Sequence, residues 1–252
     1  MKQTLHYLLS RRPSLYRLAL RVAQSRNSEK KTFLRLVRDG DVVFDIGANR
    51  GDFTVLFSHM VGRHGSVHAF EPVPPTFQEL GGRIQSECRF QNVSLNPCAL
   101  GDVEGQFQIQ VPAGDFGQAS LRNHAIASWS RPERQNFDCQ VRTLDAYVVA
   151  QQIGRLDFLK IDIEGAELPA LRGGQQTLDR FHPIIHCEYF APWTEAFGYA
   201  VGDLISFLQS HGYTHFYSGD LLPLHSPVQE LEERTESQNL VCATHPLVST
   251  DA

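Results

Sequence analysis

The chain has 252 residues, of which 42% are hydrophobic and 20% charged, so it holds enough apolar material for the core of one large globular domain. Its five cysteines include no C-x-x-C pair, which argues against a disulfide framework or a zinc knuckle and favours buried thiols in a reducing cytoplasm. The net charge of −5 is uneven, because residues 1–40 hold ten Lys or Arg and two acids and residues 41–252 carry −13.

The basic first 40 residues are predicted to form a helical extension. Apolar residues recur there at steps of three and four, as they do on one face of a helix. We favour a cap that packs its apolar stripe on the domain, although a basic helix can also lie on a membrane surface or against another anionic partner. The chain has no run of 18 apolar residues and no signal-peptide cleavage site, so we expect a cytoplasmic protein without a transmembrane segment.

From residue 41 onward, short apolar runs alternate with helical patterns. The strands expected from these runs are residues 42–46, 66–70, 93–100, 107–111, 137–141, 156–163, 183–189, 213–217 and 240–243. The expected helices are residues 53–62, 75–84, 144–153, 166–178 and 201–211. This alternation predicts an α/β fold with a mostly parallel sheet, to which the last two strands add an antiparallel pair. Residues 112–134 are rich in Gly, Ser and charge and are expected to be a loop or lid, within an insertion at about 104–141.

The first strand runs into the turn DIGANRG, residues 45–51. In open α/β sheets, ligands bind beyond the carboxyl ends of the strands. Gly47 lets the backbone pass close to a ligand, and Gly51 permits the turn into the next helix. Asp45 stands where the dinucleotide pattern G-x-G-x-x-G has its first glycine, and an acid there would repel a pyrophosphate. The turn therefore favours a ligand with an ammonium group, such as the methionine part of S-adenosylmethionine.

The second strand ends in Glu71, followed by Pro72. A carboxylate at this position can accept hydrogen bonds from both hydroxyls of a ribose, as it does in dinucleotide folds. The 26 residues from Asp45 to Glu71 are filled by one strand–helix–strand unit. Each signal is weak alone, but their order and spacing together indicate a nucleoside-containing cofactor.

Several segments of residues 41–190 resemble the FkbM family of S-adenosylmethionine-dependent methyltransferases. These segments are VVFDIGANRGDFTVLF, HAFEPVPPTFQEL, VSLNPCALGD, VRTLDAY and DFLKIDIEGAELPALRGG. The resemblance implies a class I methyltransferase fold, Rossmann-like, with a seven-stranded, mostly parallel sheet, an antiparallel last strand and helices on both faces. It also implies transfer of a methyl group to a hydroxyl of a small molecule, such as a sugar or a polyketide-like metabolite.

The resemblance also assigns roles to particular residues. It implies that Asp45, Gly47 and Asn49 line the methionine end of the cofactor and that Glu71 binds its ribose. The neighbourhood of Asn92 and Ala99 would border the adenine. Gly51 and Asp162 complete the set of residues expected at the cofactor.

A hydroxyl acceptor must lose its proton as it attacks the methyl group, so the site needs a general base or a metal ion. Asp162 and Glu164 follow one buried strand, and His186 and Glu188 close the next. Because side chains alternate along a strand, each pair can share a face and meet near the methyl group. We favour Asp162, His186 or Glu188 as a direct base. Asp162, Glu164 and Glu188 could instead hold Mg²⁺ or a similar cation, but spacing alone does not establish a metal site.

Two other classes of function compete with the methyltransferase. An NAD(P)-dependent oxidoreductase needs a glycine at Asp45 and the longer glycine pattern, and the sequence has neither. A binding protein that has lost catalysis would be free to lose Asp45, Glu71 and Asp162, all of which are intact. The acidic body and the lack of an Asn-Pro-Pro-aromatic segment argue against a nucleic-acid substrate.

Overall fold

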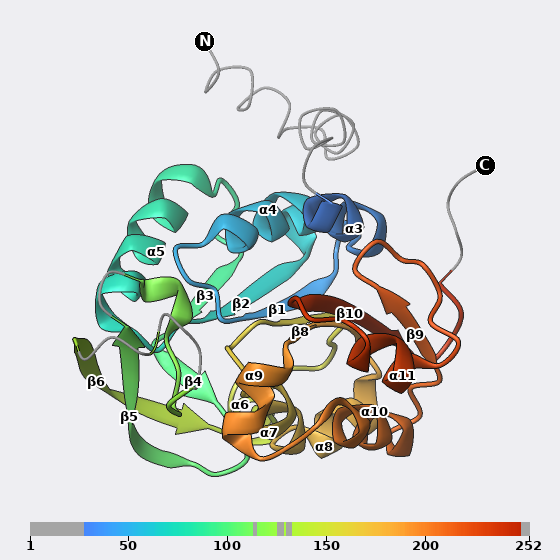
Figure 1. The fold of residues 1–252 in the computed structure, drawn as a ribbon. Coiled ribbons are helices and arrows are strands. Elements are labelled where there is room, and N and C mark those ends of the chain that lie inside the picture. Colours follow the sequence, from blue (N-terminus) through green and yellow to red (C-terminus); the bar gives the residue numbers. More distant parts are fainter. Residues whose placement is uncertain (1–27, 113–114, 125–128, 130–132, 248–252) are drawn as a thin grey trace.

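The computed structural model describes residues 28–112, 115–124, 129 and 133–247 (Figure 1). The helical extension expected over residues 1–40 is therefore seen only from α3 (Ser28–Leu36) onward, and its residues 1–27 lie outside the described residues. No helix within the described ranges is long and apolar enough to cross a membrane.

The central sheet has seven strands, in the order β3-β2-β1-β7-β8-β10-β9. Its strands are β1 (Val42–Ile46), β2 (Ser66–Phe70), β3 (Val93–Asn96), β7 (Phe158–Ile161), β8 (Ile184–Tyr189), β9 (His215–Ser218) and β10 (Gln238–Ala243). All neighbours from β3 to β8 are parallel, whereas β10 is antiparallel to both β8 and β9. The expected mostly parallel sheet with an antiparallel last strand is confirmed.

Helices cover both faces of this sheet, as expected (Figure 1). In the view of Figure 1, α3, α4 (Asp52–Val61) and α5 (Pro74–Glu87) lie above the sheet. Below it lie α6 (Leu144–Ala150), α7 (Glu167–Arg172), α8 (Gln175–Phe181) and α10 (Val201–Ser210). Side chains of β1 alternate between the two cores: Val43 packs with the upper helices, and Phe44 and Ile46 pack with the lower ones. Each large apolar side chain buried in this way stabilises the fold by roughly 1.5–3 kcal/mol.

A second sheet of three strands, in the order β4-β6-β5, stands beside the first. It consists of β4 (Cys98–Leu100), β5 (Gly105–Pro112) and β6 (Arg134–Arg142). The single strand expected over residues 93–100 is therefore wrong: β3 pairs with β2 and β4 pairs with β6. Pro97 separates the two strands because it has no N–H to continue a ladder.

The helix expected over residues 166–178 is also divided, into α7 and α8. The break falls at Gly173 and Gly174, and a Cβ on Gly173 would lie 2.1 Å from the carbonyl oxygen of Gly101. A helical side chain at this point would therefore clash with the backbone that leaves β4. Two short helices, α9 (Ala191–Thr194) and α11 (Pro227–Glu232), were not expected, because a segment of four to six residues carries too little periodicity to reveal a helix.

Candidate functional site

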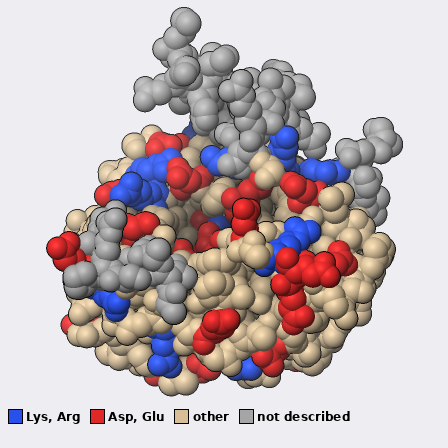
Figure 2. All heavy atoms as spheres, viewed as in Figure 1, with Lys and Arg blue, Asp and Glu red and all other residues tan. Residues whose placement is uncertain are grey.

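A cavity of about 510 Å³ lies beyond the carboxyl ends of β1, β2 and β7. The chain passes from β1 outward to β2 and β3 and later returns to β7 on the other side of β1, so β1 marks the switch point of the sheet. The walls come from the turn after β1, the end of β2, strand β4, the loop after β7 and the insertion. Figure 2 shows a hollow in this face of the molecule, bordered by acidic side chains.

The turn after β1 is packed against the loop after β7. Gly47 has φ 77°, and a Cβ there would lie 1.9 Å from the carbonyl oxygen of Asp162. Its N–H donates to the carbonyl of Phe70 over 3.1 Å, which ties the same turn to β2. Gly51, with φ 87°, is the N-cap residue that immediately precedes α4, as the sequence indicates. The glycine at position 47 is thus required by contact between two loops of the chain, in addition to any contact with a ligand.

Asp45 lies behind this turn and is fully buried. One carboxylate oxygen accepts a hydrogen bond from the Thr54 hydroxyl over 2.6 Å, and the other lies 3.4 Å from the Lys160 ammonium. Burial raises the pKa of Asp45 above its ordinary value, although Lys160 opposes the shift. Asp162 lines the cavity, whereas Asp45 does not belong to the described residues that line it. The expected contact between Asp45 and a cofactor ammonium is therefore indirect, and Asp162 is the acid that faces this part of the cavity.

Glu71 lines the cavity at the end of β2 and is 5% exposed. Its two oxygens accept hydrogen bonds from the N–H groups of Asn49 and Val73, each over 2.9 Å. These bonds fix the carboxylate and leave one lone pair on each oxygen for a ribose hydroxyl. Burial raises the pKa of Glu71 to about 7, and the two backbone hydrogen bonds lower it in part.

Of the two residues expected near adenine, only Ala99 lies at the edge of the sheet where the cavity is. Ala99 lines the cavity together with its neighbours on β4. Asn92 precedes β3 at its amino end, and its side-chain amide donates to the carbonyls of Ser58 and Gly62 over 3.0 and 2.8 Å. The expectation for Asn92 is wrong, because a residue at the start of a parallel strand lies at the edge of the sheet opposite to the one where the cavity is.

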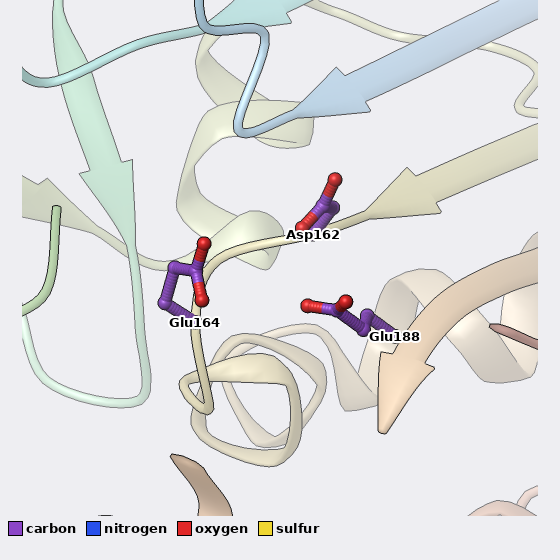
Figure 3. A group of neighbouring side chains, drawn as sticks. All are labelled: Asp162, Glu164 and Glu188. Atoms are coloured by element: carbon purple, nitrogen blue, oxygen red, sulfur yellow. The ribbon is translucent and has the colours of Figure 1, made fainter. Parts of the chain in front are cut away.

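Three carboxylates meet where the loop after β7 faces β8. Asp162, Glu164 and Glu188 each offer an oxygen atom, and these atoms all lie within 4.8 Å of one another (Figure 3). Asp162 and Glu164 come from the loop, and Glu188 reaches toward them from β8. The sequence predicts this convergence, and it is the group of possible metal ligands found within the described part of the chain.

The shape of that loop depends on Glu167, which the sequence does not reveal as important. Glu164 has φ 56°, a left-handed conformation that is uncommon for a residue other than glycine. One oxygen of the buried Glu167 accepts hydrogen bonds from the N–H groups of Ile163 and Gly165 on either side, over 3.0 and 3.3 Å. Glu167 therefore holds Glu164 in place within the cluster.

Two of the three carboxylates in this cluster, Glu164 and Glu188, have raised pKa values. Burial, followed by repulsion from Glu188 and Asp162, raises the pKa of Glu164 to about 10. Burial also raises the pKa of Glu188 to about 7, and Asp162 adds to that shift. Glu164 therefore keeps its own proton at neutral pH and cannot accept another.

His186 does not join this cluster. It is 1% exposed, and neither ring nitrogen has a hydrogen-bond partner among the described residues. Its ring packs against Phe33 of α3 with 4.7 Å between ring centres, and burial lowers its pKa to about 3. The expectation of a catalytic histidine is wrong, because α3 covers the face of β8 on which His186 lies.

The insertion forms one wall of the cavity, through a short 3-10 helix, Phe116–Gln118, and residues 119–121. Ser120 donates to the carbonyl of Glu164 over 3.4 Å and bonds the ring of His124 over 2.8 Å. His124 in turn packs on Trp129 and Trp193, with 5.0 and 4.1 Å between ring centres. His124 and Trp129 are both buried, and this packing anchors the insertion.

The sequence did not identify Phe116 or Ser120 as lining residues, since a loop shows no periodicity from which contacts can be inferred. Lys160 was also missed, although a lysine within the buried run FLKI carries a signal: a cation there needs acidic partners. Arg50, which also lines the cavity, forms an ion pair with Glu79 at the surface, with 3.0 Å between the N and O atoms.

Comparison with known proteins identifies the family. The family model described as "Methyltransferase FkbM domain" matches residues 45–214, which is more than half of the chain. The chain belongs to the FkbM methyltransferase family. The 31-O-demethyl-FK506 methyltransferase FkbM of Streptomyces tacrolimicus is 28% identical over 199 residues, covering 71% of this chain and 74% of that protein. Methyltransferase 1 of Beauveria bassiana is 28% identical over 152 residues, covering 54% of this chain and 59% of that protein.

The fold of this family member has solved counterparts. A protein from Clostridium thermocellum, provisionally described as an rRNA-methylase, matches with a TM-score of 0.50 and 11% identity, covering 88% of this chain and 94% of its own. That likeness concerns the fold alone, which is the class I methyltransferase fold. As a member of this family the chain is an S-adenosylmethionine-dependent methyltransferase.

Proposed function

We propose that this FkbM methyltransferase transfers the methyl group of S-adenosylmethionine to a hydroxyl oxygen of a small molecule. The observation that carries the proposal is the position of Asp162, which lines the cofactor cavity and also belongs to the carboxylate cluster. A methyl donor held in the cavity therefore lies beside groups that can accept a proton. The Streptomyces relative is named for an O-demethylated substrate, which supports an oxygen acceptor.

Asp162 is the best candidate for the general base. Its side chain is 39% exposed toward the cavity, whereas Glu164 keeps its own proton because its pKa is raised to about 10. Attack by the acceptor oxygen forms the O–CH₃ bond while the S–CH₃ electron pair returns to sulfur and gives S-adenosylhomocysteine. The hydroxyl proton passes to Asp162, and Glu188 lies close enough to share it. A base in this position contributes roughly 10²–10⁴-fold to the rate.

A divalent cation is the alternative means of activating the hydroxyl. Hard cations such as Mg²⁺ prefer carboxylate oxygens, and the three oxygens within 4.8 Å of one another offer such a set. The cation would bind the acceptor oxygen and lower its pKa, so that no side chain needs to act as a base. A metal would also stabilise the ionised forms of three acids that otherwise repel one another.

The first experiment tests the cofactor and the reaction. We expect calorimetry to detect binding of S-adenosylhomocysteine and no binding of NAD⁺. Transfer of an isotopically labelled methyl group to a panel of sugars and polyketide-like alcohols should give an ether, which resists mild base, whereas a methyl ester would be cleaved. Binding of NAD⁺ alone would reject the methyltransferase, and cofactor binding without transfer to any acceptor would favour a protein that has lost catalysis.

The second experiment separates the base from the metal. Asp162→Asn should lower turnover by roughly 10²–10⁴-fold if Asp162 is the base. The control Glu195→Gln changes an exposed acid outside the cavity and should have no effect. Under the base mechanism a chelator leaves the rate of the wild-type protein unchanged. Loss of activity with the chelator, restored by added Mg²⁺, would favour the metal instead.

A further inference from the structure

Lys160 is a charged residue buried in the middle of the sheet. It is the third residue of β7, its side chain is 1% exposed, and its register partners are Asp45 on β1 and His186 on β8. Burying an ammonium group costs several kcal/mol unless it is well paired. A lysine at this position therefore needs a reason stronger than packing, since an apolar residue would fill the same space without that cost.

The Lys160 ammonium is paired with acceptors from both loops that border the cofactor. It lies 3.3 Å from the Gly47 carbonyl oxygen in the turn after β1 and 3.4 Å from a carboxylate oxygen of Asp162 in the loop after β7. The carboxylate of Asp45 completes the set at 3.4 Å, and the Phe53 ring covers the ammonium at 5.4 Å from its centre. One cation thus joins a strand and the two loops.

We infer that Lys160 is a positioning residue that shapes the methionine-binding half of the cofactor site. By binding both the Gly47 carbonyl and the Asp162 carboxylate, it sets the separation and direction of two groups that face the amino-acid part of S-adenosylmethionine. This role rests on the proposed function, because it requires that the cavity bind S-adenosylmethionine.

The described polar contacts of the Lys160 ammonium do not include the ribose half of the site, and its charge only lowers the pKa of Glu71 as the smallest of the causes that shift it. Glu71 is held by the N–H groups of Asn49 and Val73, and Ala99 reaches the cavity from the other sheet. Neutralising Lys160 should therefore weaken the binding of ligands that carry the amino acid and spare those that carry only the nucleoside. A merely structural lysine would affect both kinds of ligand alike.

The experiment compares S-adenosylhomocysteine with 5′-methylthioadenosine, which keeps the adenine, ribose and thioether but lacks the amino acid. Lys160→Met preserves the length of the side chain and removes its charge. We expect the dissociation constant of S-adenosylhomocysteine to rise roughly 10- to 100-fold, as for the loss of hydrogen bonds to charged groups. The dissociation constant of 5′-methylthioadenosine should change by less than about threefold, within the scatter of a remote substitution. Lys160→Arg, which keeps the charge, should recover part of the lost affinity.

Removing the ammonium alone leaves Asp45 buried without its cation, so Lys160→Met can also lower stability. The double variant Lys160→Met with Asp45→Asn restores the charge balance, and Asp45→Asn alone serves as its reference. We expect the double variant to recover the melting temperature without recovering the preference for S-adenosylhomocysteine. Recovery of both, or an unchanged preference in Lys160→Met, would overturn the role of Lys160. Failure of the wild-type protein to bind S-adenosylhomocysteine would instead reject the proposed function, and this role with it.

Discussion

Replacing Gly47 with alanine tests whether the loops after β1 and β7 depend on close backbone contact. The residue has φ 77°, and the added Cβ would lie 1.9 Å from the carbonyl oxygen of Asp162, closer than the 3.0 Å below which real Cβ atoms essentially never approach. The two loops would have to separate by about 1 Å, because both atoms of the clash belong to backbone or lie next to it.

The expected cost has two parts. A left-handed conformation costs an alanine about 1–2 kcal/mol relative to glycine. Separating the loops also weakens the bonds from the Gly47 N–H to Phe70 and from the Asp162 N–H to Ile46, each 3.1 Å long and each worth about 0.5–1.5 kcal/mol. The total is about 2–5 kcal/mol, which for a protein of this size lowers the melting temperature by about 4–20 °C.

Gly198→Ala is the matched control. Gly198 has nearly the same φ, 75°, but no described atom lies within 4 Å of a Cβ built there. It should therefore show the conformational cost alone, about 1–2 kcal/mol, with unchanged binding of S-adenosylhomocysteine. Thermal denaturation and calorimetry on both variants measure the difference. If Gly47→Ala were no less stable than Gly198→Ala and bound the ligand equally well, the contact between the loops would not exist as described.

Three further outcomes follow from the site. Because burial raises the pKa of Glu71 to about 7 and the ribose hydroxyls need its ionised form, affinity for S-adenosylhomocysteine should be level above pH 8. Below pH 7 the affinity should fall by up to about tenfold per pH unit. Calorimetry should show that Glu71→Gln removes most of this dependence on pH. His186 is buried neutral with its pKa lowered to about 3, so the unfolded chain gains a proton below pH 6.5 and the folded one does not. Between pH 7.5 and 5.5, the wild type should therefore lose about 1.4 kcal/mol of unfolding free energy that His186→Leu does not lose, as measured by urea denaturation. The variant should turn over at the normal rate. An equal loss of stability in both proteins would refute the buried neutral state of His186. Asn92→Ala should cost about 1–3 kcal/mol in the same assay, because the Gly62 carbonyl loses its side-chain partner, whereas the Ser58 carbonyl keeps the Gly62 N–H. A simultaneous loss of cofactor affinity would contradict the place of Asn92 at the amino end of β3.

Local patterns were enough to place Gly47 and Glu71 at one cavity. Short segments of the sequence each predict one feature: the order of strands and helices, the turn at Gly47 or the acid at Glu71. They can do so because a strand, a tight turn and a helix each have their own periodicity and their own preferred residues. The family resemblance, which lies within residues 41–190, indicated the cofactor and the class of reaction.

The carboxylate cluster depended on contacts between distant segments. His186 and Glu188 lie on the same face of β8 by alternation, and the sequence does not show that α3 covers one of them while the other reaches Asp162. Nor does it show that a lysine in a buried strand joins Gly47 to Asp162. Strand and turn chemistry is local and can be read along the chain, whereas burial and pairing of charges are properties of surfaces that meet only when the chain has folded.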